Sequence, residues 1–427
     1  MQAQSKLLSL ILALMVQVFP VYAAGQCPAI DLDGELAKSA SQHLRFATFN
    51  TYLNRRTEGG LIADLRDPTD QLSGEDASDR QIGAVAEIIQ RVRPDVLLMN
   101  EFDYDSDSKS IDLFQRNFLE VSQNGRAPIH YPYHFSAAVN TGVPSGFDLN
   151  NDGKIAGPED SFGYGEFPGQ YGMVLLSMFP IDEQAIRTFQ KFLWKEMPGA
   201  SLPDDPDTPV ASDWYNSEEL KALRLSSKSH WDVPVKINNQ LVHILMAHPT
   251  PPGFDGSEDR NGRRNHDEIR FWADYVRGDN SADYIQDDQG IRGGLEATQQ
   301  FVILGDYNAD INDGSSFNHA IAQLLNHPGI NARIAPSSPG AEIDSLKTKK
   351  INTLHKGDPA LDTADFNPED PGNLRADYVL PSTKVEAICG GVFWPAPSDA
   401  SYYLVGSGFP VVSSDHHLVW MDVALPE

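Results

Sequence analysis

The segment Pro94-Asp95-Val96-Leu97-Leu98-Met99-Asn100-Glu101 contains a short apolar run that leads directly into two polar residues. Residues 96–99 have the length and composition of a buried strand. Apolar residues recur at helical spacing over residues 82–92, and Pro94 ends that pattern. We therefore predict a helix, then a buried strand that carries Glu101 at its carboxyl end.

Three other predicted strands also end in a polar residue that can take part in chemistry. A polar side chain often ends a strand simply because the chain meets water there, so each one alone says little. Together with Glu101 they are expected to gather at one rim of a sheet and to form a site. The side chains are Asn50 at the end of strand 44–50, His248 after strand 241–247, and Asp306 after strand 301–304.

Strands and helices are mixed along the rest of the chain, and no repeat of fixed period interrupts them. Further strands are predicted over residues 173–178, 233–237, 378–380 and 418–423, with Asn238-Asn239 as a hairpin turn, and helices over 111–119, 266–276 and 317–325. We predict a leader over residues 25–43 and one domain over 44–427, with insertions near 140–170, 190–232, 251–298 and 333–373.

The composition is strongly acidic. The 427 residues include 33 Lys and Arg against 60 Asp and Glu, which gives a formal net charge of −27. The net charge therefore excludes non-specific electrostatic attraction to nucleic acid or to an anionic membrane as the default expectation, because both carry a charge of the same sign as the protein. A hydrophobic fraction of 41% is enough for a large core.

The N-terminus has the pattern of an export signal. In residues 1–24, Lys6 precedes an apolar run over 7–19 and a stretch of small residues follows, and the run is too short to span a bilayer. We expect a secreted or periplasmic protein. The cysteines are Cys27 and Cys389, which in an oxidising compartment either form a disulfide or remain two buried thiols.

Five segments follow one another in a specific order: Ala47-Thr48-Phe49-Asn50, Pro94 to Glu101, His243 to His248, Gly305-Asp306-Tyr307-Asn308, and Ser414-Asp415-His416. This order resembles the endonuclease/exonuclease/phosphatase family, which includes deoxyribonuclease I, abasic-site endonucleases, sphingomyelinases and inositol-polyphosphate 5-phosphatases. The resemblance implies an α/β fold, a four-layered sandwich of two mixed or antiparallel β-sheets flanked by helices. It also implies phosphoester hydrolysis with Mg²⁺ or Mn²⁺.

The chemistry of phosphoester hydrolysis matches these residue types. It needs a divalent cation, a carboxylate that deprotonates water, and donors for the charge that builds on phosphorus. By resemblance, Asp306 is the base and Asp377 orients the terminal histidine, while carboxylates suit a hard cation. The predicted catalytic residues are His248, Asp306, Asn308, Asp377 and His416, and the predicted metal ligands are Asn50, Glu101 and Asp415.

Some positions depart from the family pattern or lie outside it. Tyr52 stands where nucleases of the family often carry an acid, which weakens the case for a second metal. Tyr171 and the neighbouring Gln170 are candidates for the residue that relatives place near the phosphate. Arg263 and Arg264 belong to the one dense cationic cluster, which predicts either a phosphate clamp or a solvated loop with a helix cap.

Residues 148–159 match the spacing of an EF-hand calcium loop. Oxygen-bearing residues occupy loop positions 1, 3, 5 and 12, Gly153 occupies position 6, and a main-chain carbonyl is available at position 7. Prolines and glycines on both sides argue against flanking helices, so we expect an isolated loop with a structural Ca²⁺, or else an ordinary acidic turn. The predicted ligands are Asp148, Asn150, Asp152, Lys154 through its carbonyl, and Glu159.

Three functions are consistent with the sequence. The first is an exported, metal-dependent phosphoester hydrolase, most simply a phosphodiesterase, which uses direct in-line attack by water. The second is a secreted nuclease, which the net charge and the lack of a long basic stripe disfavour. The third is a calcium-stabilised binding protein, which the complete set of predicted catalytic residues disfavours. The substrate and the oligomeric state are left open.

Overall fold

The computed structural model describes residues 38, 42–67, 77–406 and 410–426. The predicted export signal, most of the leader and Cys27 lie outside the described residues. Cys389 lies buried in a strand, and its pairing with Cys27 stays a prediction. Among the described residues, no helix is long and apolar enough to cross a membrane.

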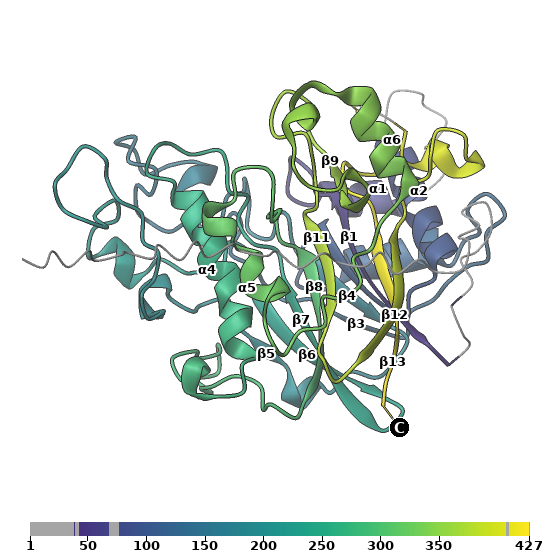
Figure 1. Cartoon of the computed structure of the whole chain (residues 1–427), viewed down its shortest axis with the longest axis horizontal. Helices are drawn as coiled ribbons and strands as arrows, with labels where there is room; N and C mark the ends of the chain where they lie inside the picture. The colour runs from purple at the N-terminus through teal and green to yellow at the C-terminus, as the bar shows by residue number, and fades with distance from the viewer. Residues whose placement is uncertain (1–37, 39–41, 68–76, 407–409, 427) are drawn as a thin grey trace, which may run out of the picture.

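Two β-sheets packed face to face form the centre of the molecule (Figure 1). The strands β1 and β2 are parallel to each other in the first sheet, as are β7 and β8 in the second, and the other neighbours are antiparallel. The first sheet has the order β12 (Glu386–Val392), β13 (Val419–Ala424), β1 (Leu44–Leu53), β2 (Val96–Phe102), β4 (Met173–Ser177) and β3 (Tyr133–Phe135). The second has the order β11 (Asp377–Pro381), β8 (Gln300–Asp306), β7 (Gln240–Ala247), β6 (His230–Ile237) and β5 (Arg187–Thr188).

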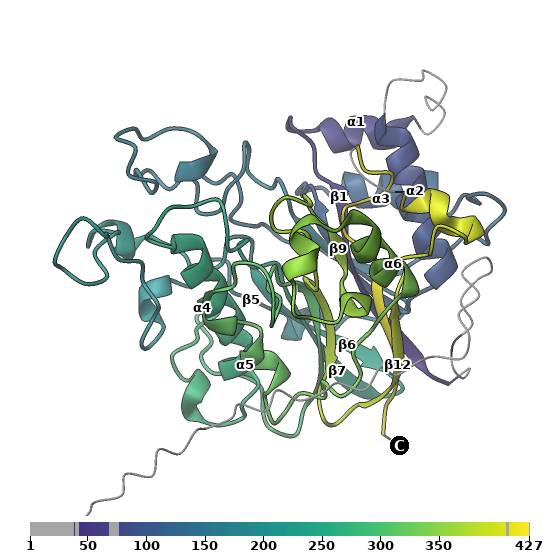
Figure 2. The ribbon, with the colours of Figure 1, turned by 45° about the horizontal axis from the view of Figure 1, so that its top comes forward.

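Helices cover the outer face of each sheet, which makes four layers. Figures 1 and 2 show α4 and α5 beside the second sheet, with α1 and α2 on the side of the first. The predicted deoxyribonuclease I-like sandwich is therefore confirmed. The helices are α1 (Gly60–Arg66), α2 (Ala77–Val92), α3 (Lys109–Phe114) with a π-helical turn over Gln115–Leu119, α4 (Arg260–Tyr275), α5 (Ala322–Leu325) and α6 (Pro339–Thr348), while β9 (Ala364–Asp365) and β10 (Asn373–Leu374) form a small separate sheet.

Strand β7 shows why these sequences form buried strands. Its successive side chains point to opposite faces: Ile244 and Met246 enter the core between the two sheets, whereas Leu245 and Ala247 pack under α4. Because both faces are covered, the strand is a nearly continuous apolar run rather than an alternating one. The same reasoning applies to residues 96–99 of β2, which are all buried.

Most of the predicted elements are present, with local differences. The turn at Asn238-Asn239 joins β6 to β7 with positive φ at both residues, as a tight hairpin requires. The predicted helix over 317–325 is wrong, because Asn318 has a φ of 48° and breaks it into a 3₁₀ turn and the short α5. The helix α6 lies inside the predicted insertion 333–373, where no helix was expected.

Candidate active site

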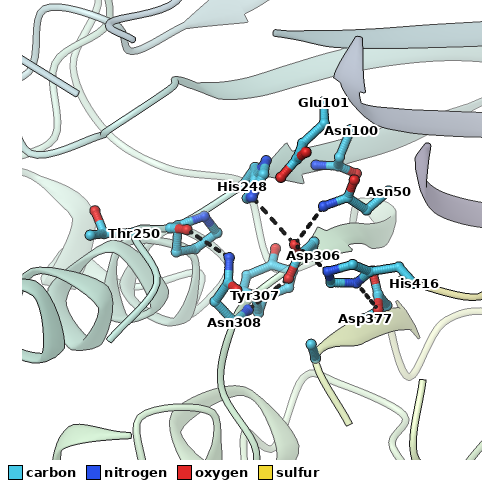
Figure 3. A network of polar contacts seen from close by, with 12 residues as sticks. Asn50, Asn100, Glu101, His248, Thr250, Asp306, Tyr307, Asn308, Asp377 and His416 are labelled. Atoms are coloured by element: carbon cyan, nitrogen blue, oxygen red, sulfur yellow. Dashed lines mark hydrogen bonds and ion pairs between the residues drawn. The ribbon is translucent and has the colours of Figure 1, made fainter. Parts of the chain in front are cut away.

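Four strand ends bring the predicted side chains to one place (Figure 3). Asn50 of β1 pairs in register with Asn100 of the parallel strand β2, so Glu101 lies one residue beyond it. In the second sheet, His248 follows β7 and Asp306 ends the parallel strand β8. The carboxyl ends of both parallel pairs therefore meet where the two sheets pack together.

Asp306 is the residue on which these side chains converge. Its Oδ2 atom accepts a hydrogen bond from Asn50 Nδ2 at 3.1 Å and lies 3.3 Å from His248 Nε2 and 3.7 Å from His416 Nε2. Its Oδ1 atom accepts the main-chain N–H of Asn308 at 2.9 Å. Burial opposes ionisation, but the charges of His416 and His248 and the hydrogen bonds from His248 and Asn50 lower the pKa of Asp306 well below its usual range. Asp306 is therefore a carboxylate at neutral pH.

His416 is fixed by a second carboxylate. Its Nδ1 atom donates to Asp377 Oδ2 at 2.8 Å, and Thr363 Oγ1 donates to the same oxygen at 2.7 Å. Burial alone lowers the pKa of His416, but the carboxylates of Asp377 and Asp306 raise it well above its ordinary value. The predicted orienting role of Asp377 thus agrees with the geometry, and the Nε2 atom of a protonated His416 faces the site.

Glu101 lies on the opposite side of the site, in a strained backbone. It has a φ of 57°, and Tyr52 and Tyr171 also have positive φ, a backbone conformation that residues other than glycine rarely adopt. Asn54 Nδ2 holds Glu101 Oε2 at 2.7 Å, and Figure 3 shows the Glu101 carboxylate pointing toward Asn50 and His248. Asp103 accepts the N–H of Tyr171 at 3.1 Å, which fixes that loop beside the site.

The helix α4 positions the loops that follow β7 and β8. The two carboxylate oxygens of Glu268 accept the N–H groups of Ser227 and Thr250, each at 2.7 Å. The Nδ2 atom of Asn265 donates to the carbonyls of Thr250 and Tyr307, each at 2.8 Å. These buried contacts hold the loops that carry His248 and Asp306 at a fixed separation.

The comparison with protein families decides the identity of this arrangement. A model of the Endonuclease/Exonuclease/phosphatase family matches residues 47–416. The chain belongs to this family. Membership places it among the phosphoester hydrolases, and it confirms the resemblance seen in the sequence.

Solved structures of the family are similar in fold and distant in sequence. An endonuclease/exonuclease/phosphatase from Beutenbergia cavernae is 16% identical, with 90% of this chain and 72% of that chain covered and a TM-score of 0.47. Sphingomyelinase C from Streptomyces griseocarneus is 15% identical, with 90% of this chain and 99% of that chain covered and a TM-score of 0.41. A mannosyl-6-phosphatase from Bacteroides thetaiotaomicron is 11% identical, with 90% of this chain and 100% of that chain covered and a TM-score of 0.40. A search among curated proteins finds no match.

The family implies a divalent cation, and the donor set on the Glu101 side fits one. Burial raises the pKa of the Asp415 carboxyl, and the nearby charges of Glu101 and Asp306 raise it further. Burial and the charges of Asp415 and Glu101 raise the pKa of Tyr52. Within the described residues, no Lys or Arg lies in ion-pair contact with Glu101 or Asp415. This surplus of oxygen-borne negative charge is what a hard cation neutralises.

A second group of ligand atoms is also compact. Atoms of Asp306, Asp377 and His416 lie within 4.8 Å of one another. However, His416 is hydrogen-bonded to Asp377, and a protonated histidine neutralises the carboxylates around it. The metal therefore suits the Glu101 side better, and this triad suits proton transfer.

The residues predicted to bind phosphate lie in different surroundings. Tyr171 is half-buried near Glu101, and burial and that charge raise its pKa. Gln170 is buried and tied to main-chain groups of Arg55 and Glu166. Arg263 lies over the ring of Phe317, 4.8 Å from its centroid.

The predicted role of Arg264 in a phosphate clamp is corrected by its contacts. It donates to the carbonyls of Leu225, Phe162 and Arg224 at 2.7, 2.5 and 3.0 Å. Its guanidinium therefore fastens α4 to the neighbouring loops and is not left for a phosphate.

The candidate calcium loop contacts Trp214, whose indole N–H donates to the carbonyl of Leu149 at 3.2 Å. Asp148 accepts the N–H groups of Asp152 and Gly153 at 3.0 and 2.8 Å, which curls the loop around its first position. Glu159, the predicted closing ligand, is exposed, whereas Asp160 accepts the N–H groups of Leu149 and Ala156 inside the loop. The described flanks contain no α-helix, as predicted, and only a 3₁₀ turn over Pro158–Asp160 follows.

Sequence reasoning missed Thr363, Asp103 and Glu268, which act by holding other groups. None belongs to a recognisable motif, and Thr363 lies in a predicted insertion. Their partners lie 14, 68 and 41 residues away along the chain, so only the folded chain reveals them.

Proposed function

We propose that this protein is an exported, divalent-metal-dependent phosphodiesterase in which water attacks phosphorus in line with the leaving group. The observation that carries the proposal is the convergence of Asn50, His248 and His416 on one oxygen of an ionised Asp306. A buried carboxylate fixed by surrounding donors is positioned to accept a proton from an attacking water.

Each side chain has a role that follows from its position. A divalent cation held by Glu101 and Asp415 would neutralise the oxygens of the bound phosphoryl group. Asp306 orients water and accepts its proton. His416, kept protonated by Asp377, donates a hydrogen bond to the charge that develops on phosphoryl oxygen. Asn50 holds Asp306 in place, and its Oδ1 atom accepts the N–H of Tyr52 at 3.2 Å.

A small diester suits the chain better than a polymer. The formal net charge of −27 repels long polyanions, and Arg264 of the cationic cluster faces inward to main-chain carbonyls. The neighbours named above include a sphingomyelinase and a sugar phosphatase, so related folds serve different phosphate esters. The loops around the site select the substrate.

The first test of the proposal is a pair of substitutions. Asp306→Asn removes the base and His248→Ala removes a donor, so each is expected to lower kcat by at least about 10²-fold. Because Asp306→Asn preserves the size of the side chain, its melting temperature should stay within about 3 °C of the wild type, whereas His248→Ala removes a buried ring and is therefore compared by its kcat per folded molecule. Turnover of bis(p-nitrophenyl) phosphate and thermal melting measure the two effects.

The control for this pair is His130→Ala, a change at an exposed histidine paired with Glu120. It should leave both kcat and melting unchanged. Wild-type turnover in both Asp306→Asn and His248→Ala would contradict the assignment of the site.

We also propose that residues 148–159 bind a structural Ca²⁺, because their spacing matches that of a calcium loop. Calcium should raise the melting temperature of the wild type, since a ligand that binds the native state stabilises it. Glu159→Gln should abolish that increase and should leave melting in chelator unchanged. Glu183→Gln, at another exposed position, is the control. Equal melting of wild type and Glu159→Gln in calcium would contradict the calcium site.

Export and the disulfide complete the proposal. The pattern of residues 1–24 supports cleavage and export, and an oxidising compartment favours a bond between Cys27 and Cys389.

A further inference from the structure

Lys228 is a buried lysine beside the candidate active site. It precedes β6, its carbonyl accepts the N–H of Asn140 at 2.9 Å, and the residue is only 6% exposed. Its neighbour Ser227 places it near His248, because Ser227 Oγ donates to the carbonyl of His248 at 3.4 Å. The backbone around Lys228 is therefore tied to the loop that carries a catalytic residue.

The ammonium of Lys228 has no partner in the described part of the chain. No carboxylate oxygen there lies within 4.0 Å of it, and it makes no hydrogen bond. Glu268 is not an ion-pair partner of Lys228, and its two oxygens instead accept the main-chain N–H groups of Ser227 and Thr250. Burial lowers the pKa of Lys228, while the charges of Glu101, Glu268 and Asp306 raise it, so the ammonium lies within electrostatic range of these acidic side chains.

A largely buried cation without a partner is costly to fold, because it keeps only part of its water and gains no hydrogen bond in exchange. Arg264 shows the alternative in the same region, since this half-buried cation donates to three main-chain carbonyls. Lys228 also lies close enough to His248 for its charge to lower the pKa of that histidine, although burial is the larger cause. A bound anion beside His248 would give the ammonium the partner that no described residue provides.

We propose that Lys228 is a substrate-binding residue whose ammonium donates hydrogen bonds to a non-bridging oxygen of the phosphoryl group. The proposal rests on the proposed function and identifies the group that takes the place of the predicted arginine clamp. No bond forms or breaks at Lys228. The negative charge on the phosphoryl oxygens during in-line attack strengthens the contact, so Lys228 contributes to turnover as well as to binding.

The test compares activity with stability. Lys228→Met keeps the length of the side chain and removes the charge, so kcat/KM for the diester should fall by about 10²-fold. The melting temperature should equal or exceed that of the wild type, because an unpartnered buried charge has been removed. Lys228→Arg keeps the charge and should retain more activity than Lys228→Met.

Lys236→Met is the matched control, because Lys236 lies exposed on β6, the strand that follows Lys228, in an ion pair with Asp182. It should change neither activity nor inhibition by inorganic phosphate. In Lys228→Met, the inhibition constant for inorganic phosphate should rise by about 10-fold or more, the loss of one charged contact.

The outcomes separate this inference from the proposed function. If the wild type turns over the diester and Lys228→Met matches it in kcat/KM and in phosphate inhibition, the role of Lys228 is overturned. A melting temperature lowered by more than about 5 °C in Lys228→Met would also overturn it, because the lysine would then be structural. If the wild type hydrolyses no ester, the proposed function fails, and calorimetric binding of inorganic phosphate to both proteins decides the inference. Loss of that binding in Lys228→Met supports it, and equal binding overturns it.

Discussion

At the scale of single residues, the site depends on side chains held in conformations that the isolated chain disfavours. Glu101, Tyr171 and Asn308 all have left-handed backbone angles, with φ of 57°, 56° and 49°. Neighbouring groups compensate for this: Asn54 binds Glu101, Asp103 binds the N–H of Tyr171, and Asp306 binds the N–H of Asn308. Such strain is retained where it places a functional group.

A prediction at this scale concerns Asp377. Asp377→Asn removes the charge that keeps His416 protonated while leaving a group of the same size, so kcat should fall by about 10²-fold. Thermal melting should change little. Steady-state turnover and melting measure both effects.

The chain offers a matched control for this change. Asp232 is another buried aspartate bound to a histidine, His243 at 2.7 Å, and it also accepts a hydrogen bond from Tyr275 of α4. Asp232→Asn should keep full turnover, because this pair lies under α4 away from Asp306. Equal kcat losses in the two variants would mean that Asp377 acts only through the fold.

At the scale of elements, the parts of the site that the sequence predicts are those set by strand ends. Asn50, Glu101, His248 and Asp306 each follow an apolar run, so their place in a sheet is a local property. Lys228 and Thr363 lie in irregular segments, and their positions depend on contacts between segments: Ser227, next to Lys228, donates to His248, and Thr363 donates to Asp377. A cationic cluster in the sequence suggested Arg264 instead, because local pattern cannot show which carbonyls a guanidinium will meet.

The pairing of β1 with β13 carries a stability prediction. Arg45 and Asp422 are fully buried and form a bidentate ion pair at 2.7 and 3.0 Å, and Arg45 lies 4.2 Å over the ring of Trp420. Asp422→Ala leaves a buried guanidinium without its counter-charge, so the free energy of unfolding should fall by about 3–5 kcal/mol. Urea denaturation measures the loss.

The double variant Arg45→Met with Asp422→Leu is the control. Replacing both charges with apolar groups should recover most of the stability. Activity per folded molecule should be unchanged in both proteins, since the pair lies on the strands and not at their ends. A loss below about 1 kcal/mol in Asp422→Ala would show that the pair is unimportant.

At the scale of the whole molecule, the two sheets pack so that carboxylates and cationic side chains lie together at one end of their interface. The acidic surface repels polyanions, yet the site combines a place for a cation with protonated His416 and buried Lys228. A single phosphate group can enter where a polymer is repelled. The selectivity that we propose would come from where the few cations lie and not from the fold alone.

The most direct test of the central claim is the metal dependence of diester hydrolysis by the purified mature protein. After removal of metals by chelation, the wild type should be inactive on bis(p-nitrophenyl) phosphate and should regain activity with Mg²⁺ or Mn²⁺. Plasmid DNA should be cleaved poorly, and Asp306→Asn should stay inactive with either metal. Hydrolysis that is unaffected by chelation, or equal hydrolysis by Asp306→Asn, would contradict the account.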